Sequence, residues 1–335
     1  MKHHEFWPPR VFEAPYYAQL VGRSLLRGMS PTQIPKANWA LENGEIGLGT
    51  KYSTQLAFEQ SRFPVTSCIT LPDATLDVDD LGARHGFPLI VKPLIGVVGK
   101  GVLKLSDAEQ LKQAVSTLSG DYVVQSYCPD PTEFGVFFIR KGGSNRISGI
   151  NQKHFPTVVG DGHSNLGQLA TAHPRYTAHW PIFLRYLDLS EVPAAGEERQ
   201  LSFIGSHTMG CKFTNDTDQL TRALEAAVFR VTDSQPGFNF GRFDVKSPSL
   251  EALRDGEFTI IEVNGIASLP THMFDPSYSL NQAYEIFFEH GRYLVDIAHE
   301  HRHVEMDIDS VTTLWQRARA LSGELNNMHE RAKTR

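Results

Sequence analysis

The sequence predicts an α+β fold in which antiparallel strand pairs form the core and helices cover them. Between Phe240 and Asn264, two strand-like runs, FGRFDVK and EFTIIEVNG, flank a turn-rich insert, which is the pattern of a hairpin. A second antiparallel pair, EFGVFFIRKG and RISGINQKH, meets around Gly142 and Gly143. Between Asp216 and Val231 the apolar residues recur at helical spacing, which predicts an amphipathic helix.

The first 86 residues alternate short helices with loops rich in proline and glycine. Helical patterns run from about Tyr16 to Arg27 and from Thr54 to Gln60. The segment FPVTSCITLPD is a strand bounded by prolines. The segment from Asp77 to His85 predicts a helix that ends at Gly86, because glycine is favoured just after the last helical residue.

Buried strands and capped helices follow. FPLIVKP and DYVVQSY are short apolar runs rich in branched residues, which is typical of buried strands. Between them, Ser106 is expected to cap a helix that extends to about Leu118, with Glu109 completing a capping box. A short helix begins at Leu166, and the tail from 281 to 330 has a helical pattern.

Composition narrows the class of protein. A chain of 335 residues is long enough for two or three lobes. The formal net charge of −6 argues against nucleic acid as the main partner. The three cysteines form no CxxC motif, which excludes a disulfide scaffold and fits a reducing compartment. The sequence shows neither a secretory signal nor a run of about 18 apolar residues, so we expect a cytoplasmic protein that does not span a membrane.

The predicted hairpin at Phe240–Asn264 carries three oxygen-bearing side chains. Glu262 and Asn264 are two residues apart and therefore face the same side of a strand. If the two runs pair, Asp244 joins them. Carboxylate and amide oxygens suit a hard cation such as Mg²⁺, which usually reaches proteins together with substrate phosphates. The alternative is a surface hairpin with incidental acids.

Lys92 and the loop after it form a candidate phosphate site. A lysine within an apolar strand is costly to bury unless an anion meets it. Gly96, Gly99 and Gly101 allow backbone N–H groups to approach phosphate oxygens, and Lys100 adds a charge. The alternative is a lysine that extends to solvent beside a flexible turn. The loop is not a P-loop, because no Ser or Thr follows Lys100.

Two further residues lie where strands meet loops. Glu133 follows the strand DYVVQSY, at a place where backbone groups often bind adenine and a carboxylate binds ribose. An ordinary surface glutamate in a linker is the alternative. Lys153 lies near the end of RISGINQKH, before a loop in which Asp161 and Gly162 indicate a turn.

In this order the motifs resemble the ATP-grasp superfamily, over about residues 50–275. The matching segments are GTKYSTQ, PLIVKPLIGVVGKGV, YVVQSYCPDPTEFGV, KHFPTVVGDGHSNLGQL and the pair GRFDVK and IIEVNG. The fourth segment looks like the corresponding loop of cyanophycin-synthetase-type enzymes, and the layout is similar to that of D-alanine–D-alanine ligases. The last pair looks closer still to bacterial ATP-grasp proteins of the carboxylate–amine ligase type.

The resemblance implies an ATP-grasp fold in three parts. These are a small N-terminal α/β lobe over residues 1–60, a central lid subdomain over 61–150, and a C-terminal antiparallel-sheet subdomain with a helical tail over 151–335. It implies that ATP binds between the last two parts. It also implies one or two Mg²⁺ ions, for which Mn²⁺ can substitute.

The resemblance further implies roles for individual residues. Lys51 and Lys92 would contact ATP, the loop Ile95–Gly101 would close over the phosphates, and Lys153 would reach the γ-phosphate. Gln125 and Tyr127 would border adenine, and Glu133 would bind ribose. Arg242 would steady the transferring group, with Lys153 as its catalytic partner. Asp244, Glu262 and Asn264 would hold Mg²⁺. Near the substrates, His207 and Lys212 are candidates for binding a carboxylate, and Ser268 and His272 for contacting the second substrate; ordinary structural roles are the alternative for all four.

The activity that the resemblance implies is ATP-dependent ligation of a carboxylate to an amine through an acylphosphate. The expected partners are small molecules, with an amino acid or short peptide among them, and homodimers are common in similar enzymes. Two alternatives stay open. One is a phosphotransferase that uses the same site and stops at the phosphorylated acceptor. The other is an ATP-binding module without catalysis.

Overall fold

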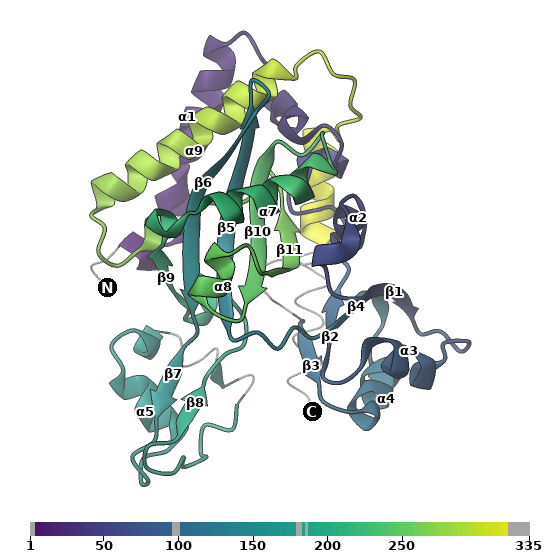
Figure 1. The fold of residues 1–335 in the computed structure, drawn as a ribbon, viewed down its shortest axis with the longest axis vertical. Coiled ribbons are helices and arrows are strands. Elements are labelled where there is room, and N and C mark those ends of the chain that lie inside the picture. The colour runs from purple at the N-terminus through teal and green to yellow at the C-terminus, as the bar shows by residue number, and fades with distance from the viewer. Residues whose placement is uncertain (1–3, 96–100, 179–182, 185–186, 321–335) are drawn as a thin grey trace.

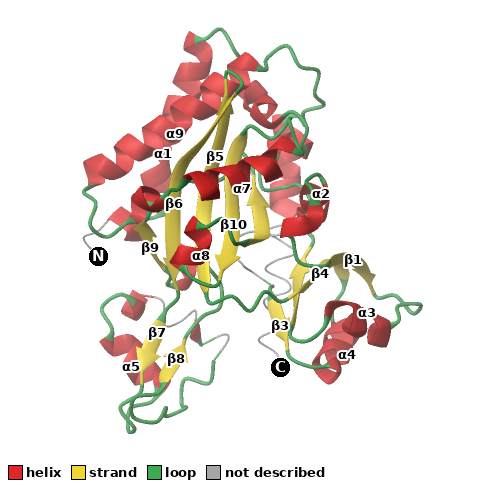
Figure 2. Ribbon diagram, in the orientation of Figure 1, coloured by secondary structure: helices red, strands yellow, loops and turns green. Residues whose placement is uncertain are grey.

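The structure, a computed structural model, describes residues 4–95, 101–178, 183–184 and 187–320. A central five-stranded antiparallel sheet has the strand order β11–β10–β5–β6–β9 (Figure 1). Two smaller lobes extend from one end of it. One is built on the four-stranded sheet β1–β4–β2–β3, and the other on the two-stranded sheet β7–β8 (Figure 2). The predicted α+β class, with a C-terminal antiparallel sheet, is confirmed.

The central sheet contains both predicted strand pairs. Its strands are β5 (Thr132–Lys141), β6 (Ser144–His154), β9 (Lys212–Asn215), β10 (Phe240–Ser247) and β11 (Thr259–Asn264). β5 and β6 turn at Gly142 and Gly143, which have φ of 58° and 73°, so two residues without a Cβ are needed there. In β10 and β11, Asp244 lies opposite Glu262 and Arg242 opposite Asn264.

Each face of the central sheet is covered differently. Helices α7 (Arg222–Asp233) and α8 (Leu250–Arg254) pack on one face, against alternate residues of β5 such as Phe134 and Phe138. On the opposite face, α9 (Leu280–Glu300) packs on the far end of the sheet, against Ile139 and Phe240, with α1 (Pro9–Leu26) outside it. The rest of that second face points toward the two small lobes.

The four-stranded lobe follows the predicted order of elements. It contains β1 (Thr66–Leu71), α3 (Val78–His85), β2 (Leu89–Pro93), β3 (Leu103–Leu105), α4 (Ala108–Thr117) and β4 (Gly120–Ser126). One prediction is wrong in detail. Asp107, and not Ser106, caps α4, because its carboxylate accepts the N–H of Gln110 at 2.9 Å.

The remaining lobe and the connections complete the fold. The lobe contains β7 (Thr157–Val159), α5 (Leu166–Ala172) and β8 (Glu198–Gln200). Helix α2 (Lys51–Leu56) precedes β1, beginning three residues earlier than predicted. Short 3₁₀ segments lie at His4–Phe6, Pro31–Asn38, Glu42–Gly44, Gln60–Arg62, Tyr176–Ala178, His207–Met209, Thr217–Gln219 and Thr271–Phe274.

The structure differs from the sequence at the start of one helix and at one expected domain boundary. The helix expected from Asp216 begins only at Arg222, because Thr221 caps it and a 3₁₀ turn precedes it. The domain boundary expected at residue 150 falls within β6, whose neighbours β5 and β9 lie in the same sheet. The division into three domains therefore stays a prediction.

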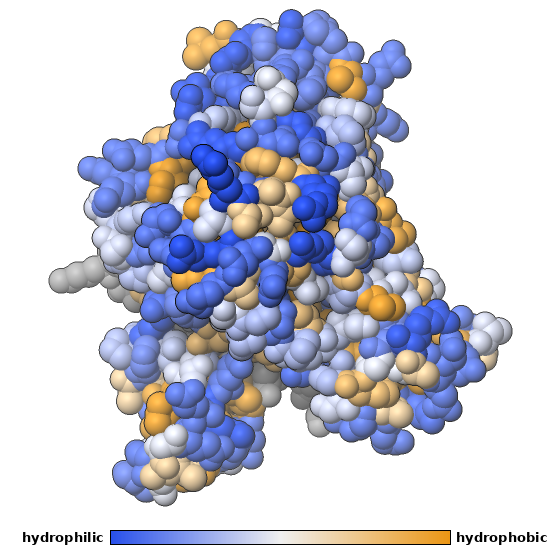
Figure 3. All heavy atoms as spheres, in the orientation of Figure 1, coloured by the Kyte–Doolittle hydropathy of each residue, from blue (hydrophilic) through white to orange (hydrophobic). Residues whose placement is uncertain are grey.

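Within the described ranges, none of the helices is both long and apolar enough to cross a membrane. The face over α7 and α8 is largely hydrophilic (Figure 3).

We expect Gly291 to control the packing of α1 on α9. A Cβ at this position would lie 2.8 Å from Cε2 of Tyr16, whose ring stacks on Phe287 at 4.1 Å. Gly291→Val should therefore lower the free energy of unfolding by about 1–3 kcal/mol, as overpacking does. Gly22→Ala, on the open side of α1, should instead raise it by about 1 kcal/mol. Denaturant unfolding measures both, and equal effects of the two variants would contradict this packing.

Candidate functional site

A buried network of four charged side chains lies on the face of the central sheet that points toward the lobes. Lys153 Nζ lies 2.7 Å from Glu133 Oε1 and 3.2 Å from Asp244 Oδ2. Arg242 donates to both oxygens of Asp244, through Nε at 2.7 Å and through a terminal nitrogen at 3.1 Å. Asn264 donates to Asp244 Oδ2 at 3.3 Å. Two cations and two carboxylates therefore neutralise one another in one place.

The strand register places these side chains together. Glu133 lies opposite Lys153, and Asp244 lies opposite Gly135. Two glycines leave room for the long side chains, because a Cβ on Gly205 would overlap Glu133 Oε1 and one on Gly135 would come within 3.0 Å of Arg242 Cδ. The backbone geometry thus favours a crowded charged cluster over an apolar one.

Burial and charge act in opposite directions on the cations of this network. Burial alone would lower the pKa of Lys153, but Asp244 and Glu133 raise it above its ordinary value. The pKa of Arg242 is likewise raised, because the neighbouring Asp244 outweighs the effect of burial. Both side chains therefore stay positively charged although the solvent scarcely reaches them.

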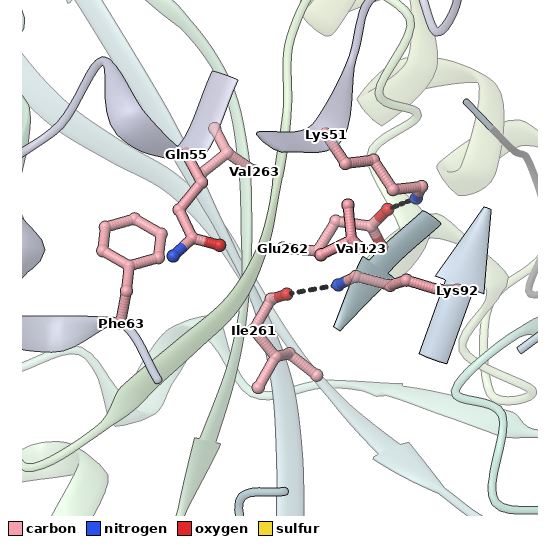
Figure 4. Close-up of a pocket in the computed structure, with 8 residues that line it drawn as sticks. All are labelled: Lys51, Gln55, Phe63, Lys92, Val123, Ile261, Glu262 and Val263. Atoms are coloured by element: carbon pink, nitrogen blue, oxygen red, sulfur yellow. Dashed lines mark hydrogen bonds and ion pairs between the residues drawn. The ribbon is translucent and has the colours of Figure 1, made fainter. Parts of the chain in front are cut away.

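A second charged group bridges the central sheet and the four-stranded lobe (Figure 4). Lys51, at the start of α2, forms an ion pair with Glu262 on β11. Lys92, on β2, donates to Gln125 Oε1 at 3.1 Å and to the carbonyl oxygen of Ile261 at 3.4 Å. Lys92 thus connects strands of the two sheets.

The pKa values of Lys92 and Glu262 are also shifted. Burial lowers the pKa of Lys92 to about 8, with a further contribution from the charge of Lys51. Burial would raise the pKa of Glu262, but Lys51 and Lys92 hold it well below its usual range. Side chains with strongly shifted pKa values, such as Lys92 and Glu262, cluster at functional sites.

The cavity between these residues is small. Its volume is about 10 Å³, and Lys51, Lys92, Gln55 and Glu262 contribute polar atoms to its wall. A volume of this size holds about one water molecule. A larger ligand that entered this cavity would have to displace Lys51 or separate the lobe from the central sheet.

The donor set expected for a cation consists of Asp244, Glu262 and Asn264. Among the described residues, no three side chains of His, Cys, Asp or Glu gather as a complete metal centre. Two carboxylates and one amide oxygen nevertheless fit Mg²⁺, because this ion prefers oxygen ligands and keeps several positions for water and substrate phosphates. In this structure Arg242, Lys153 and Lys51 neutralise the two carboxylates.

A residue that the sequence reasoning missed holds the connection between the two sheets. Lys246 Nζ donates to the carbonyl oxygens of Cys128 and Asp130, at 3.1 and 2.9 Å, in the loop that joins β4 to β5. Two ammonium groups lie over the ring of Tyr127, that of Lys104 at 3.9 Å and that of Lys246 at 5.1 Å from its centroid. The available signal was the position of Lys246, two residues after Asp244 and therefore on the same strand face.

The remaining residues predicted to contact ATP are Gln125 and those of the glycine-rich loop. Gln125 is buried, and Lys92, Gln55 and Thr66 occupy its amide group, so a base that contacted it would have to replace these bonds. Gly101 precedes β3 and has a φ of 73°. Gly96, Gly99 and Lys100 lie outside the described residues.

The four residues predicted to contact substrates lie in different surroundings. His207 stacks on Phe274 at 4.9 Å and lies 3.6 Å from Glu5, and Lys212 belongs to β9 opposite His154. The hydroxyl of Ser268 donates to the carbonyl oxygen of Gly265. His272 lies on the same face of the central sheet as the charged network, packed on Gly149 and with its ring 5.2 Å from that of Phe137.

Comparison with known proteins gives a distant likeness of fold. Neither a protein-family model nor a curated protein matches the chain. Among solved structures, it is similar to D-alanine–D-alanine ligase from Bacillus anthracis, with 16% identity and a TM-score of 0.44 over 76% of this chain and 70% of that one. It is also similar to the bifunctional glutathione synthetase from Pasteurella multocida, with 15% identity and a TM-score of 0.40 over 71% and 36%.

A third similar structure is the ADP complex of N5-carboxyaminoimidazole ribonucleotide synthetase, with 14% identity and a TM-score of 0.42 over 74% of this chain and 51% of that one. The matched region thus spans about half of the synthetase and about a third of the glutathione enzyme. D-alanine–D-alanine ligase, which the sequence motifs resemble, is one of the solved structures that this fold resembles.

We expect Lys153 to be essential to the stability of the buried network. Lys153→Met would leave Glu133 and Asp244 with one cation, Arg242, in a site that excludes water. Breaking a buried ion pair in this way costs about 3–5 kcal/mol, so the free energy of unfolding should fall by that amount. As a control, Lys112→Met removes an exposed partner of Asp79 and should change stability little. Equal effects in denaturant unfolding would contradict the role of Lys153.

Proposed function

We propose that this protein is an ATP- and Mg²⁺-dependent carboxylate–amine ligase of the ATP-grasp kind, which forms an amide bond through an acylphosphate. The observation that carries the proposal is the meeting of Lys51, Lys92 and Glu262 at the junction of two sheets, beside the network of Lys153 and Arg242. The order of the sequence motifs supports the same assignment. The substrates would be small molecules, and a cytoplasmic location and a homodimer stay expectations.

The cations of the site suit a triphosphate. Phosphoryl transfer depends on positioning and on neutralising charge rather than on covalent help from the protein. Lys92 is partly buried beside backbone atoms of β11, where a phosphate would stabilise its charge. Lys51 is partly exposed and held by one carboxylate, so it can exchange Glu262 for a phosphate oxygen. Lys153 would reach the terminal phosphate from β6.

Asp244, Glu262 and Asn264 are the residues that would hold Mg²⁺. The ion would supply positive charge at the phosphate oxygens, which lowers the barrier to transfer. The chain contributes the oxygen donors on paired strands and the cations that balance them. Arg242, bound to both oxygens of Asp244, fixes the orientation of that carboxylate.

The loop between β4 and β5 would hold the base and sugar. Tyr127 lies at this connection, and Lys246 fixes the backbone that follows it by donating to the carbonyl oxygens of Cys128 and Asp130. Glu133 is the second residue of β5, the strand after the loop, and would bind ribose hydroxyls, for which its bond to Lys153 would have to loosen. Lys246 would act here as a positioning residue.

The proposed reaction has two steps. An oxygen of the acid attacks the γ-phosphorus, and ADP leaves with the electrons of the broken P–O bond. The amine nitrogen then bonds to the acyl carbon, phosphate leaves, and a proton of the amine passes to phosphate or solvent. A thiol nucleophile is not needed, which agrees with Cys211, since burial raises the pKa of its thiol to about 12.

Glu262→Gln tests the metal assignment. The amide cannot replace the negative charge of the carboxylate, so ATP turnover should fall by about 100-fold or more. A coupled ADP-release assay measures it. Glu257→Gln, an exposed change in the same hairpin, is the matched control and should leave turnover unchanged. Turnover of the Glu262 variant at the control's rate would reject the metal site.

The ligase reading is tested by ADP release with amino acids and short peptides supplied in pairs. Release that needs both an acid and an amine identifies a ligase, and release with one acceptor alone identifies a phosphotransferase. Hydroxylamine should trap the acylphosphate as a hydroxamate in the presence of ATP and the acid. If calorimetry detects no binding of Mg-ATP, both enzymatic readings fail.

Lys246→Met tests the positioning role. Loss of two hydrogen bonds to the loop should raise the KM for ATP about tenfold, equivalent to about 1.4 kcal/mol, with little change in kcat. Lys104→Met removes the other ammonium group over Tyr127 and keeps those two bonds, so its KM should change less. A fall in kcat at constant KM for the Lys246 variant would contradict the assignment.

A further inference from the structure

Residues 204–211, in the connection from β8 to β9, lie directly over part of the charged network, and we call them the cover. A Cβ on Gly205 would overlap Glu133 Oε1 and would come within 3.0 Å of Lys153 Cδ. Glu133 and Lys153 are each 5% exposed. A ribose hydroxyl that bound Glu133 Oε1 where Gly205 now lies would therefore first have to displace the cover.

The cover is a compact turn whose two ends are bonded to each other. The backbone N–H groups of Met209 and Cys211 donate to the carbonyl oxygen of Ser206, at 3.0 and 3.2 Å. The thiol of Cys211 donates to the carbonyl oxygen of Ile204 at 3.3 Å. A contact that holds one part of the cover therefore restrains the whole of it.

One carboxylate near the N-terminus connects the cover to the lobe of β7 and β8. Glu5 Oε2 lies 2.7 Å from a terminal nitrogen of Arg175, in that lobe, and 3.6 Å from Nε2 of His207, in the cover. Arg175 in turn donates to the carbonyl oxygens of Cys211, at 3.0 Å, and Gly210, at 3.4 Å. We call the contacts of Glu5 with Arg175 and His207 the latch.

The latch is shielded from solvent. The side chain of Glu5 is 3% exposed and that of Arg175 is 13% exposed. Burial would raise the pKa of Glu5, but His207 and Arg175 lower it to about 2, so the carboxylate is charged at neutral pH. Because opposite charges attract more strongly where water is excluded, neutralising Glu5 would weaken the hold on the buried guanidinium.

The segment that carries Glu5 is itself fixed to the body of the protein. The ring of His4 stacks on Phe12 of α1 at 5.7 Å and on Phe274 at 6.4 Å. His4 Nε2 also lies 3.2 Å from the carbonyl oxygen of Met273. Glu5 is therefore a fixed anchor, to which the lobe and the cover are attached.

We propose that Glu5 is a positioning residue that holds the cover closed over Glu133 and thereby sets the affinity of the site for its nucleotide. The inference rests on the proposed function, in which Glu133 loosens its bond to Lys153 and binds ribose. When a ligand binds only the open molecules, its apparent affinity is reduced by the fraction of molecules that are open. Weakening the latch should therefore strengthen nucleotide binding.

Thiol labelling of Cys211 measures the opening of the cover without any nucleotide. Cys211 is fully buried, and a Cys68→Ser, Cys128→Ser background leaves it as the one reactive thiol. Glu5→Gln keeps the shape of the side chain and removes its charge, so labelling should become about tenfold faster or more. Glu13→Gln, the same change at a half-buried position of α1, is the control and should label at the wild-type rate.

A second variant shows whether Glu5 acts through the arginine. Arg175→Gln removes the same ion pair together with the bonds to the cover, so labelling should speed up at least as much as in Glu5→Gln. The double variant should label no faster than Arg175→Gln alone, because the two residues form one contact. Fully additive effects would contradict the latch.

A second reporter separates opening of the cover from global unfolding. Ser247→Cys places a thiol at a fully buried position of β10, with the three native cysteines replaced by serine. In the otherwise unchanged protein, Cys211 should label faster than this reporter, because the cover opens while the central sheet stays folded. Equal rates would show that Cys211 reacts only after global unfolding, and would overturn the proposal.

Calorimetry with Mg-ATP tests the effect on the nucleotide. The Kd in Glu5→Gln should fall by the same factor as the labelling rate of Cys211 rises, because both depend on the fraction of open molecules. An unchanged labelling rate would overturn the latch, and an unchanged or higher Kd would overturn its control of nucleotide binding. If the wild type binds no Mg-ATP, the proposed ligase function fails instead, and the labelling rates still decide whether Glu5 holds the cover.

Discussion

The buried ion pairs of Lys153 and Arg242 with Glu133 and Asp244 are the interaction on which the rest of the site depends. A buried charge is stable only if its partner is held in place, and here three neighbouring strands, β6, β5 and β10, hold the partners by their register. Because α9 covers only the far end of this sheet face, the charged part faces the lobes. The same arrangement that stabilises the charges therefore leaves them next to a junction where a ligand can exchange partners with them.

Much of the fold could be predicted from local patterns. The hairpin of β10 and β11 and the pair of β5 and β6 follow from alternating apolar residues and glycine turns, which act within a few residues. The start of α7 could not be predicted, since the apolar spacing extends into a turn that Thr221 ends by capping the helix. Similarly, Ser106 and Asp107 are both good caps by type, and only the backbone conformation selects Asp107.

For the candidate site, the strands that carry the residues could be predicted from the sequence, and the contacts between separate sheets could not. Asp244, Glu262 and Asn264 are on paired strands, and the order of residues along a strand is enough to place them on one face. The contacts of Lys51 with Glu262 and of Lys92 with Ile261 cross between separate sheets, so no spacing in the sequence encodes them. The contacts of Lys246 with Cys128 and Asp130 likewise join residues far apart in the sequence, and only its position two residues after Asp244 indicated the strand face on which it lies.

The ion pair between Lys51 and Glu262 has a consequence for the order of binding under the proposed function. While the pair is intact, Glu262 is bound to Lys51 and not to Mg²⁺, and Lys51 is bound to Glu262 and not to the nucleotide. A nucleotide that attracts Lys51 releases Glu262, and a cation that takes Glu262 releases Lys51. Whichever ligand binds first breaks the ion pair between Lys51 and Glu262, so the second ligand binds without that free-energy cost. By linkage, the metal raises the affinity for the nucleotide by the same factor as the nucleotide raises the affinity for the metal. The site would therefore show positive cooperativity between metal and nucleotide, and it would take them up as one complex.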